Sequence, residues 1–233
     1  MPILMLHGMW QGAWCWDLWQ ALLAEWGWES HAFSLPGHAG SPPQRPVPLC
    51  TLDYYLGFLE AEVARLPRPP VLMGHSMGGM LVQWYLKYVG DDLPAAVLVA
   101  SGPSHSILAA AATALLKGDP CFYPLMAFSW DATPLVRSPE RAAKLLLGPD
   151  ALYTPEAFHA KLGPESALVL YQHNPPFWHP PEHVDTPLLW LAGELDAAIP
   201  EPAGRRSAAY YGADYMMVER AGHNIMLEPS YHQ

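Results

Sequence analysis

The stretch GHSMGG, residues 74–79, decides how this chain folds, because it stands where an apolar, strand-like run must give way to a helix. The run PPVLM at 69–73 precedes it, and the helical pattern MLVQWYLKYV at 80–89 follows it. A hydroxyl raised above the end of a strand needs a sharp, strained turn, and side chains two residues before and after it would collide. Glycine occupies both of those positions here. The stretch therefore predicts a nucleophilic serine, Ser76, rather than an ordinary glycine-rich turn.

Six short runs predict the strands of a sheet around this turn. Four of them are apolar almost throughout, which is typical of strands buried on both faces of a parallel sheet, and two are weaker. Helical patterns separate the runs, such as residues 51–66, where apolar residues recur on one face. Alternating strands and helices predict one doubly wound α/β sheet flanked by helices. The six runs are 2–6, 30–35, 69–73, 94–100, 187–192 and 214–219.

The alternation stops between residues 102 and 186, where short helical patterns and many prolines occur without a convincing strand. We expect an α/β core formed by residues 1–101 and 187–233. Residues 102–186, called the insertion below, are expected to form a helical cap inserted in that core. It should lie over the carboxyl edge of the sheet, where open α/β sheets bind their ligands.

Composition excludes several classes of function. The chain has 233 residues, of which 51% are hydrophobic and 15% are charged, as in a globular protein. Its net charge of -10 disfavours nucleic acid and anionic membrane surfaces as partners. We expect neither a membrane-spanning segment nor a signal peptide, because long apolar runs and a basic N-terminal region are missing. Three cysteines without framework spacing favour a reducing, cytoplasmic location.

A serine nucleophile needs a base and a group that orients the base. Asp196 follows the run 187–192, and His223 follows the last predicted strand. Parallel strands all end at one edge of a sheet, so both side chains should lie near Ser76. Considered singly, Asp196 could cap a helix and His223 could be an ordinary histidine. Glu194 is the alternative carboxylate.

The loop HGMWQGAW at residues 7–14 follows the first predicted strand. A sharp loop at this place can aim a backbone N–H at the oxyanion that forms during attack on a carbonyl, together with the N–H of the residue after the nucleophile. The predicted donors are therefore Met9 and Met77. Trp10 replaces Met9 if the turn is one residue longer.

Five motifs together resemble the α/β-hydrolase superfamily over nearly the whole chain outside the insertion. They are HGMWQGAWCWDLW, SLPGHAGSP, GHSMGG, GELDAAIP and AGHNIMLEP. The resemblance implies that Ser76 is the nucleophile, His223 the general base and then acid, and Asp196 its orienting group. It also implies that the insertion is a cap domain and that Met9 and Met77 form the oxyanion hole.

Three departures from that family pattern stand out. Ser34 occupies a position where many members have aspartate. The chain ends ten residues after His223, where the family normally adds a helix, so we expect apolar sheet surface to be exposed. The opening loop and the histidine loop resemble plant carboxylesterases and their hydroxynitrile-lyase relatives. The lyases use threonine and lysine at the positions of Gly8 and Asn224, so the sequence disfavours lyase chemistry.

Aromatic and apolar residues of the insertion, with the tryptophans of the first loop, predict an apolar pocket, although part of this set should form the core of the cap itself. The predicted substrate-binding residues are Trp10, Met126, Trp130 and Trp178. We therefore predict a serine esterase that cleaves a hydrophobic, small-to-medium carboxylic ester through an acyl-enzyme. The same triad could instead hydrolyse C–C bonds, thioesters or lactones, perform perhydrolysis, or belong to a ligand-sensing receptor.

We expect no cofactor and no metal. The sequence HPPEH at 179–183 matches the H-x-x-E-H zinc signature. That signature needs a helix to bring both histidines to one face. Pro180 and Pro181 prevent a regular helix, so the match is expected to be fortuitous.

Overall fold

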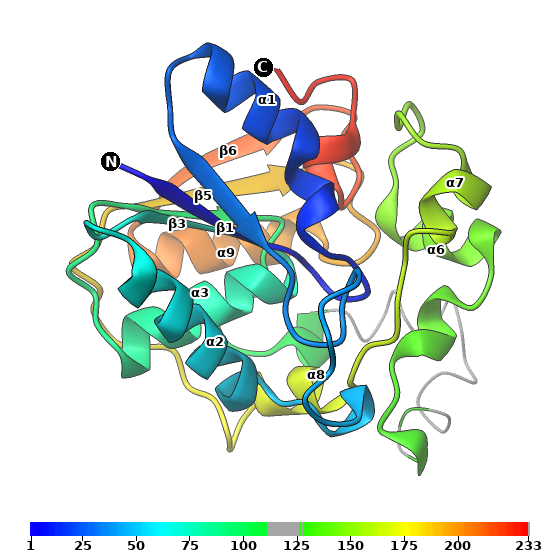
Figure 1. Ribbon diagram of the computed structural model, residues 1–233, viewed down its shortest axis with the longest axis horizontal. Coiled ribbons are helices and arrows are strands. Elements are labelled where there is room, and N and C mark those ends of the chain that lie inside the picture. The colour runs from blue at the N-terminus through cyan, green and yellow to red at the C-terminus, as the bar shows by residue number, and fades with distance from the viewer. Residues whose placement is uncertain (111–125, 127, 233) are drawn as a thin grey trace.

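The computed structural model describes residues 1–110, 126 and 128–232. Its centre is a sheet of six parallel strands in the order β2-β1-β3-β4-β5-β6 (Figure 1). Every predicted strand is present, so the predicted parallel doubly wound sheet is confirmed. The strands are Ile3–Leu6 (β1), Ser30–Phe33 (β2), Val71–His75 (β3), Ala96–Val99 (β4), Leu188–Gly193 (β5) and Asp214–Val218 (β6).

Four helices connect the strands of the core. Helix α1 lies on one face of the sheet, and α2, α3 and α9 lie on the other (Figure 1). Their bounds are Asp17–Glu25 (α1), Leu52–Arg65 (α2), Met77–Tyr88 (α3) and Glu201–Tyr211 (α9). Throughout the described part of the chain, every helix is too short or too polar to cross a bilayer.

Burial follows the apolar pattern of the sequence. Every residue of β1 and β3 is buried, whereas the edge strands β2 and β6 are largely half-buried or exposed. In α2 the buried positions are Leu52, Tyr55, Leu56 and Leu59, which lie on the predicted apolar face. This packing holds the carboxyl ends of β1, β3 and β5 at one edge of the sheet.

The insertion lies between β4 and β5, and its described residues form only short helices and one isolated bridge. They are η3 (Thr133–Val136), α6 (Pro139–Leu146), α7 (Pro155–His159) and α8 (Leu168–Gln172). The Ser138 and Thr154 side chains cap α6 and α7 by accepting hydrogen bonds from backbone N–H groups. Helices α6 and α7 lie beside the carboxyl edge of the sheet (Figure 1).

An apolar groove of about 540 Å³ runs between α1 and strands β5 and β6. Its lining includes Trp19, Trp26, Met216 and Met217. Trp26 is 60% exposed and Met216 is 54% exposed. Apolar side chains of α1 and the sheet therefore line an open groove on the α1 face.

Candidate active site

Ser76 lies at the turn from β3 into α3 with φ +53° and ψ −114°. L-residues rarely adopt a positive φ, so this backbone is strained. A Cβ on Gly74 would lie 2.3 Å from the Gly78 carbonyl oxygen, and one on Gly78 would lie 2.5 Å from the Leu6 carbonyl oxygen. Because these neighbours are backbone atoms, glycine is required at both positions. The local geometry that the GHSMGG stretch predicts is present.

The loop after β1 packs directly against this turn. A Cβ on Gly8 would lie 2.7 Å from Nδ1 of His75 and 2.9 Å from Cβ of Ser76. The Gln11 N–H donates to the Gly8 carbonyl at 3.4 Å, which closes a turn in which Trp10 has φ +64°. Met9 lies between Gly8 and Trp10 in this turn. Only glycine at position 8 allows Met9 to come so close to the serine turn.

Three backbone donors near Ser76 have no acceptor within the part of the chain that the structure describes: the N–H groups of Met9, Trp10 and Met77. All three residues are buried. Met77 is the first residue of α3, where N–H groups lack an intrahelical acceptor and the helix dipole favours negative charge. These groups could therefore stabilise an oxyanion beside Ser76.

His223 and Asp196 form a buried pair. Nδ1 of His223 lies 2.8 Å from Oδ2 of Asp196, and the two side chains are 2% and 1% exposed. The other oxygen, Oδ1, accepts hydrogen bonds from the N–H groups of Ala198 and Ile199, each at 2.8 Å. These contacts fix the carboxylate, which in turn places a proton on Nδ1 and leaves Nε2 free to accept one.

The alternative carboxylate, Glu194, is exposed and accepts a hydrogen bond from the Arg220 N–H at 2.9 Å. The structure therefore pairs Asp196, and not Glu194, with His223.

One cavity of about 50 Å³ joins these groups. Ser76 and His223 line it together with Met9 and Trp10. The remaining lining is aliphatic and comes mostly from the insertion: Ile107, Leu108, Leu135, Leu145, Leu146, Leu170, Ala198 and Ile199. The site thus combines one hydroxyl and one imidazole with an apolar wall. Leucine in a short helix is equally typical of a core, so the sequence carries no signal that these leucines line a cavity.

Of the four predicted substrate-binding residues, only Trp10 is among the described residues that line this cavity. Trp178 is fully buried elsewhere: its ring stacks on Trp84 with centroids 5.5 Å apart, and its Nε1–H donates to the Ser104 carbonyl at 2.6 Å. Met126 is buried, and Trp130 is 51% exposed. The aromatic and apolar residues of the insertion that predict a pocket also include Phe122, Tyr123 and Leu125, which lie outside the described residues.

A buried histidine, His75, supports the loops of the site. Burial lowers the pKa of His75 well below its usual range, so its ring is neutral. Its Nε2 lies 3.1 Å from the His223 carbonyl oxygen, and its Nδ1 lies 3.1 Å from the Gln11 side chain. The Gln11 atom is its amide oxygen Oε1, which like a carbonyl only accepts, so the neutral ring donates its one proton to one of these two oxygens. His75 thereby connects the histidine loop to the loop after β1.

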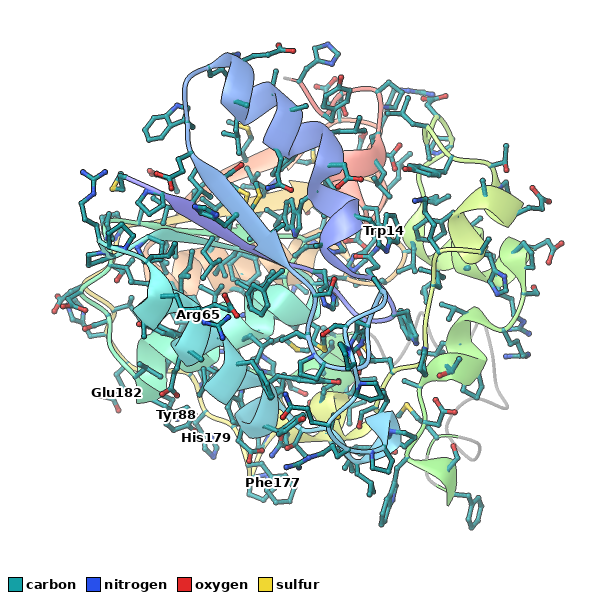
Figure 2. The ribbon with its side chains drawn as sticks, in the orientation of Figure 1. Trp14, Arg65, Tyr88, Phe177, His179 and Glu182 are labelled. Carbon is teal, nitrogen blue, oxygen red and sulfur yellow. The ribbon has the colours of Figure 1, made fainter. Side chains whose placement is uncertain are left out.

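Cys15 and the HPPEH segment, which could in principle offer a nucleophilic thiol or a metal site, do not line the cavity of Ser76 and His223. Burial raises the pKa of the Cys15 thiol well above its usual range, so Cys15 is not an activated nucleophile. The HPPEH segment at 179–183 contains no helix, as its prolines predict. His179 and Glu182 lie with Tyr88 at the outer edge of the molecule, far from α6 and α7 (Figure 2). Among the described residues, no three acidic, histidine or cysteine side chains are placed to hold a metal ion.

Comparison with known proteins gives one matching family model, described as "Alpha/beta hydrolase family", over residues 3–231. Esterase PIR7B of Oryza sativa subsp. japonica is 34% identical over 101 residues, which is 42% of this chain and 37% of that protein. Probable esterase PIR7A of Oryza sativa subsp. indica is 34% identical over 98 residues, which is 41% of this chain and 37% of that protein. The match thus spans little more than a third of these relatives.

Two solved structures have the same fold at low identity. A monoacylglycerol lipase of Paleococcus ferrophilus superposes with a TM-score of 0.74 at 20% identity, covering 99% of this chain and 89% of that one. A polyneuridine aldehyde esterase gives a TM-score of 0.74 at 20% identity, covering 99% and 94%. At this identity the likeness shows the fold.

Proposed function

This chain belongs to the alpha/beta hydrolase family, and we propose that it is a serine esterase that cleaves a hydrophobic carboxylic ester through an acyl-enzyme. The observation that carries the proposal is one cavity that holds both Ser76 and His223, with His223 hydrogen-bonded to a buried Asp196 at 2.8 Å. A nucleophile, a base and an orienting carboxylate on one site are the elements of acyl transfer. The esterase names of the rice relatives agree with this reaction.

In the proposed mechanism, Ser76 Oγ attacks the carbonyl carbon of the ester and gives its proton to Nε2 of His223. Asp196 stabilises the imidazolium that forms. The oxyanion accepts hydrogen bonds from the N–H groups of Met9 and Met77, each of which supplies about 3 kcal/mol of transition-state stabilisation. His223 then protonates the departing alcohol. Water, deprotonated by His223, releases the acid from Ser76.

The insertion, residues 102–186, is proposed to act as the cap that covers this site, with the core at 1–101 and 187–233. Its leucines Leu135, Leu145 and Leu146 line the cavity. Apolar lining favours an uncharged acyl or alcohol group. The cavity volume of about 50 Å³ is far below the roughly 300–1,000 Å³ of typical ligand pockets, which favours a short acyl group.

Hydrolysis of nitrophenyl esters from acetate to octanoate tests this proposal, with the native chain and Ser76→Ala compared at equal concentration. The native chain should release nitrophenol steadily, fastest with short acyl chains, and the variant should not exceed the rate in buffer. Thermal unfolding of both proteins checks that the variant is folded. A Ser76→Ala variant that keeps the native rate would contradict the proposal.

A further inference from the structure

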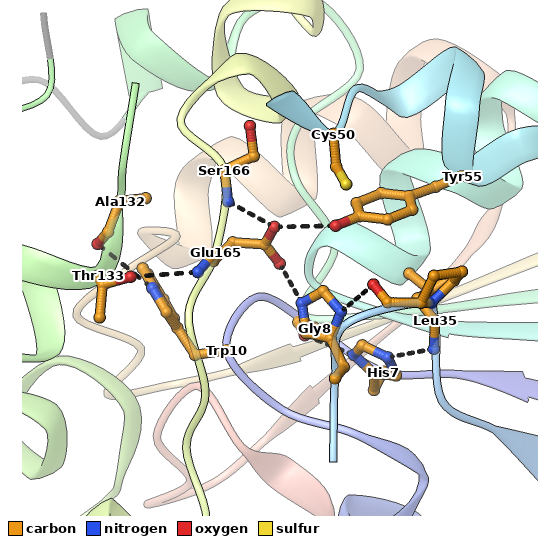
Figure 3. Close-up of polar contacts among 12 residues, drawn as sticks. His7, Gly8, Trp10, Leu35, Cys50, Tyr55, Ala132, Thr133, Glu165 and Ser166 are labelled. Atoms are coloured by element: carbon orange, nitrogen blue, oxygen red, sulfur yellow. Dashed lines mark hydrogen bonds and ion pairs between the residues drawn. The ribbon is translucent and has the colours of Figure 1, made fainter. Parts of the chain in front are cut away.

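A fully buried ion pair joins the core to the insertion. Nε2 of His38, in the loop after β2, lies 2.9 Å from Oε2 of Glu165, and both side chains are 0% exposed. The second oxygen of Glu165 accepts hydrogen bonds from the Ser166 N–H at 2.7 Å and the Tyr55 hydroxyl at 3.5 Å (Figure 3). Removing two charges from water is costly, so a pair this deeply buried is poorly explained by stability alone.

His38 donates from both ring nitrogens. Burial by itself would lower its pKa, but the Glu165 carboxylate and the hydrogen bonds raise it above the ordinary value. Nδ1 lies 3.3 Å from the Pro36 carbonyl oxygen, while Nε2 faces Glu165. The charged ring therefore bridges a core loop and the insertion.

On the core side, this pair lies next to the loop that carries Met9. The rings of His38 and His7 have centroids 4.9 Å apart. Burial lowers the pKa of His7 to about 3, so His7 is neutral. Its Nε2 accepts from the Leu35 N–H at 3.1 Å, and its Nδ1–H donates to the Gly8 carbonyl at 2.8 Å. His38 thus packs against the His7 ring, which is hydrogen-bonded to the Gly8 carbonyl.

On the insertion side, the backbone of Glu165 leads to Trp10. The Glu165 carbonyl accepts from the Ala132 N–H at 2.9 Å. The Ala132 carbonyl accepts in turn from Nε1 of Trp10 at 3.2 Å (Figure 3). The N–H of Gly163 donates to the Trp10 carbonyl at 2.8 Å. Trp10 keeps its unfavourable φ of +64° only because such contacts hold it from two segments of the insertion.

We propose that His38 and Glu165 are a pair of positioning residues that hold residues 8–10 in the conformation that aims the Met9 N–H at the oxyanion. This inference rests on the proposed esterase function. Neither side chain lines the cavity of Ser76 and His223. The pair acts through His7 on Gly8 and through Ala132 and Gly163 on Trp10, which are the two neighbours of Met9. Its loss should therefore weaken transition-state binding more than substrate binding.

The test compares Glu165→Ala with Glu165→Gln. The alanine variant removes the contact with His38, and we expect kcat for nitrophenyl acetate to fall about 10- to 100-fold with KM changed less than about threefold. Glutamine can donate to a neutral His38 ring, so Glu165→Gln should recover most of kcat. If the alanine variant does not fold, Glu165→Met fills the volume and should show the same loss.

A second readout separates positioning from a general weakening of the fold. A trifluoromethyl ketone forms a tetrahedral adduct with a serine nucleophile, whereas the corresponding secondary alcohol binds without reacting. Glu165→Ala should lower the affinity for the ketone by the same factor by which it lowers kcat. The affinity for the alcohol should stay unchanged. The control is Gln172→Ala, which removes hydrogen bonds from the insertion to Leu52 and Asp53 of α2 and should keep the native kcat.

Two results would overturn the inference while leaving the esterase proposal intact. One is a folded Glu165→Ala variant with native kcat and native ketone affinity. The other is an equal loss of ketone and alcohol affinity, which would place the pair in substrate binding. Failure of the esterase proposal itself is recognised separately, because the native chain would then be no faster than Ser76→Ala.

Discussion

Replacing Asp196 by asparagine keeps the shape of the side chain but removes its negative charge and turns one acceptor oxygen into a donor amide. Oδ1 of Asp196 accepts from the N–H groups of Ala198 and Ile199, and an asparagine oxygen can keep both hydrogen bonds. The amide NH₂ then faces Nδ1 of His223, where Oδ2 lies 2.8 Å away in the native chain. Nδ1 must accept instead of donate, so the imidazole proton moves to Nε2.

This tautomer cannot take the proton of Ser76, and the charge that stabilised the imidazolium is gone. The same exchange in a serine protease triad lowers kcat about 10⁴-fold. That factor corresponds to about 5 kcal/mol of transition-state stabilisation. We expect a loss of this size in kcat/KM for Asp196→Asn, with the unfolding temperature nearly unchanged because the two backbone contacts remain.

Nitrophenyl acetate hydrolysis and thermal unfolding measure both quantities on the same samples. Glu194→Gln is the matched control, because Glu194 is an exposed carboxylate two residues away that accepts its hydrogen bond from the Arg220 N–H. It should keep the native rate. An Asp196→Asn variant with more than a tenth of the native kcat/KM would refute the reasoning, and a large loss in Glu194→Gln would point to that carboxylate instead.

The structure makes two further predictions. Gly78→Ala should lower the free energy of unfolding by about 2 kcal/mol or more, because its Cβ would lie 2.5 Å from the Leu6 carbonyl oxygen. Urea unfolding measures this loss, and an unchanged urea midpoint would be evidence against the contact. Burial raises the pKa of Glu228, whose Oε1 accepts from the N–H groups of Gly148 and Gly222. The folded state therefore binds this proton more tightly than the unfolded state, and the charged form destabilises the native chain above its folded pKa. Glu228→Gln should accordingly be at least as stable as the native chain at pH 7. The difference in the free energy of unfolding should shrink as the pH falls towards 4.5, the ordinary pKa of the group. A stability difference independent of pH would count against a buried charge.

The parts of this molecule that the sequence predicts are those fixed by local chain geometry. Ser76, Asp196 and His223 each follow a strand, and parallel strands end at one edge, so their convergence can be inferred without knowing any contact. Four of the six strands are recognisable in the sequence because strands buried on both faces of a parallel sheet are apolar almost throughout, whereas the edge strands β2 and β6 give weaker patterns.

Other features depend on contacts between distant residues. His38 and Glu165 are 127 positions apart, and nothing in either local sequence indicates the pairing. Trp178 shows the limit of composition: an aromatic residue suits a pocket wall and a core equally, and this one stacks on Trp84 and His173 in the core. The leucines that line the cavity have the same ambiguity.

Every step of the proposed reaction depends on Ser76 as the reactive nucleophile. Labelling the native chain with a fluorophosphonate and mapping the adduct by peptide mass spectrometry tests this directly. We predict one phosphonylated residue per chain, located on Ser76, with labelling strongly reduced in Asp196→Asn. A native chain that stays unlabelled, or that carries the label on another residue, would contradict the central claim.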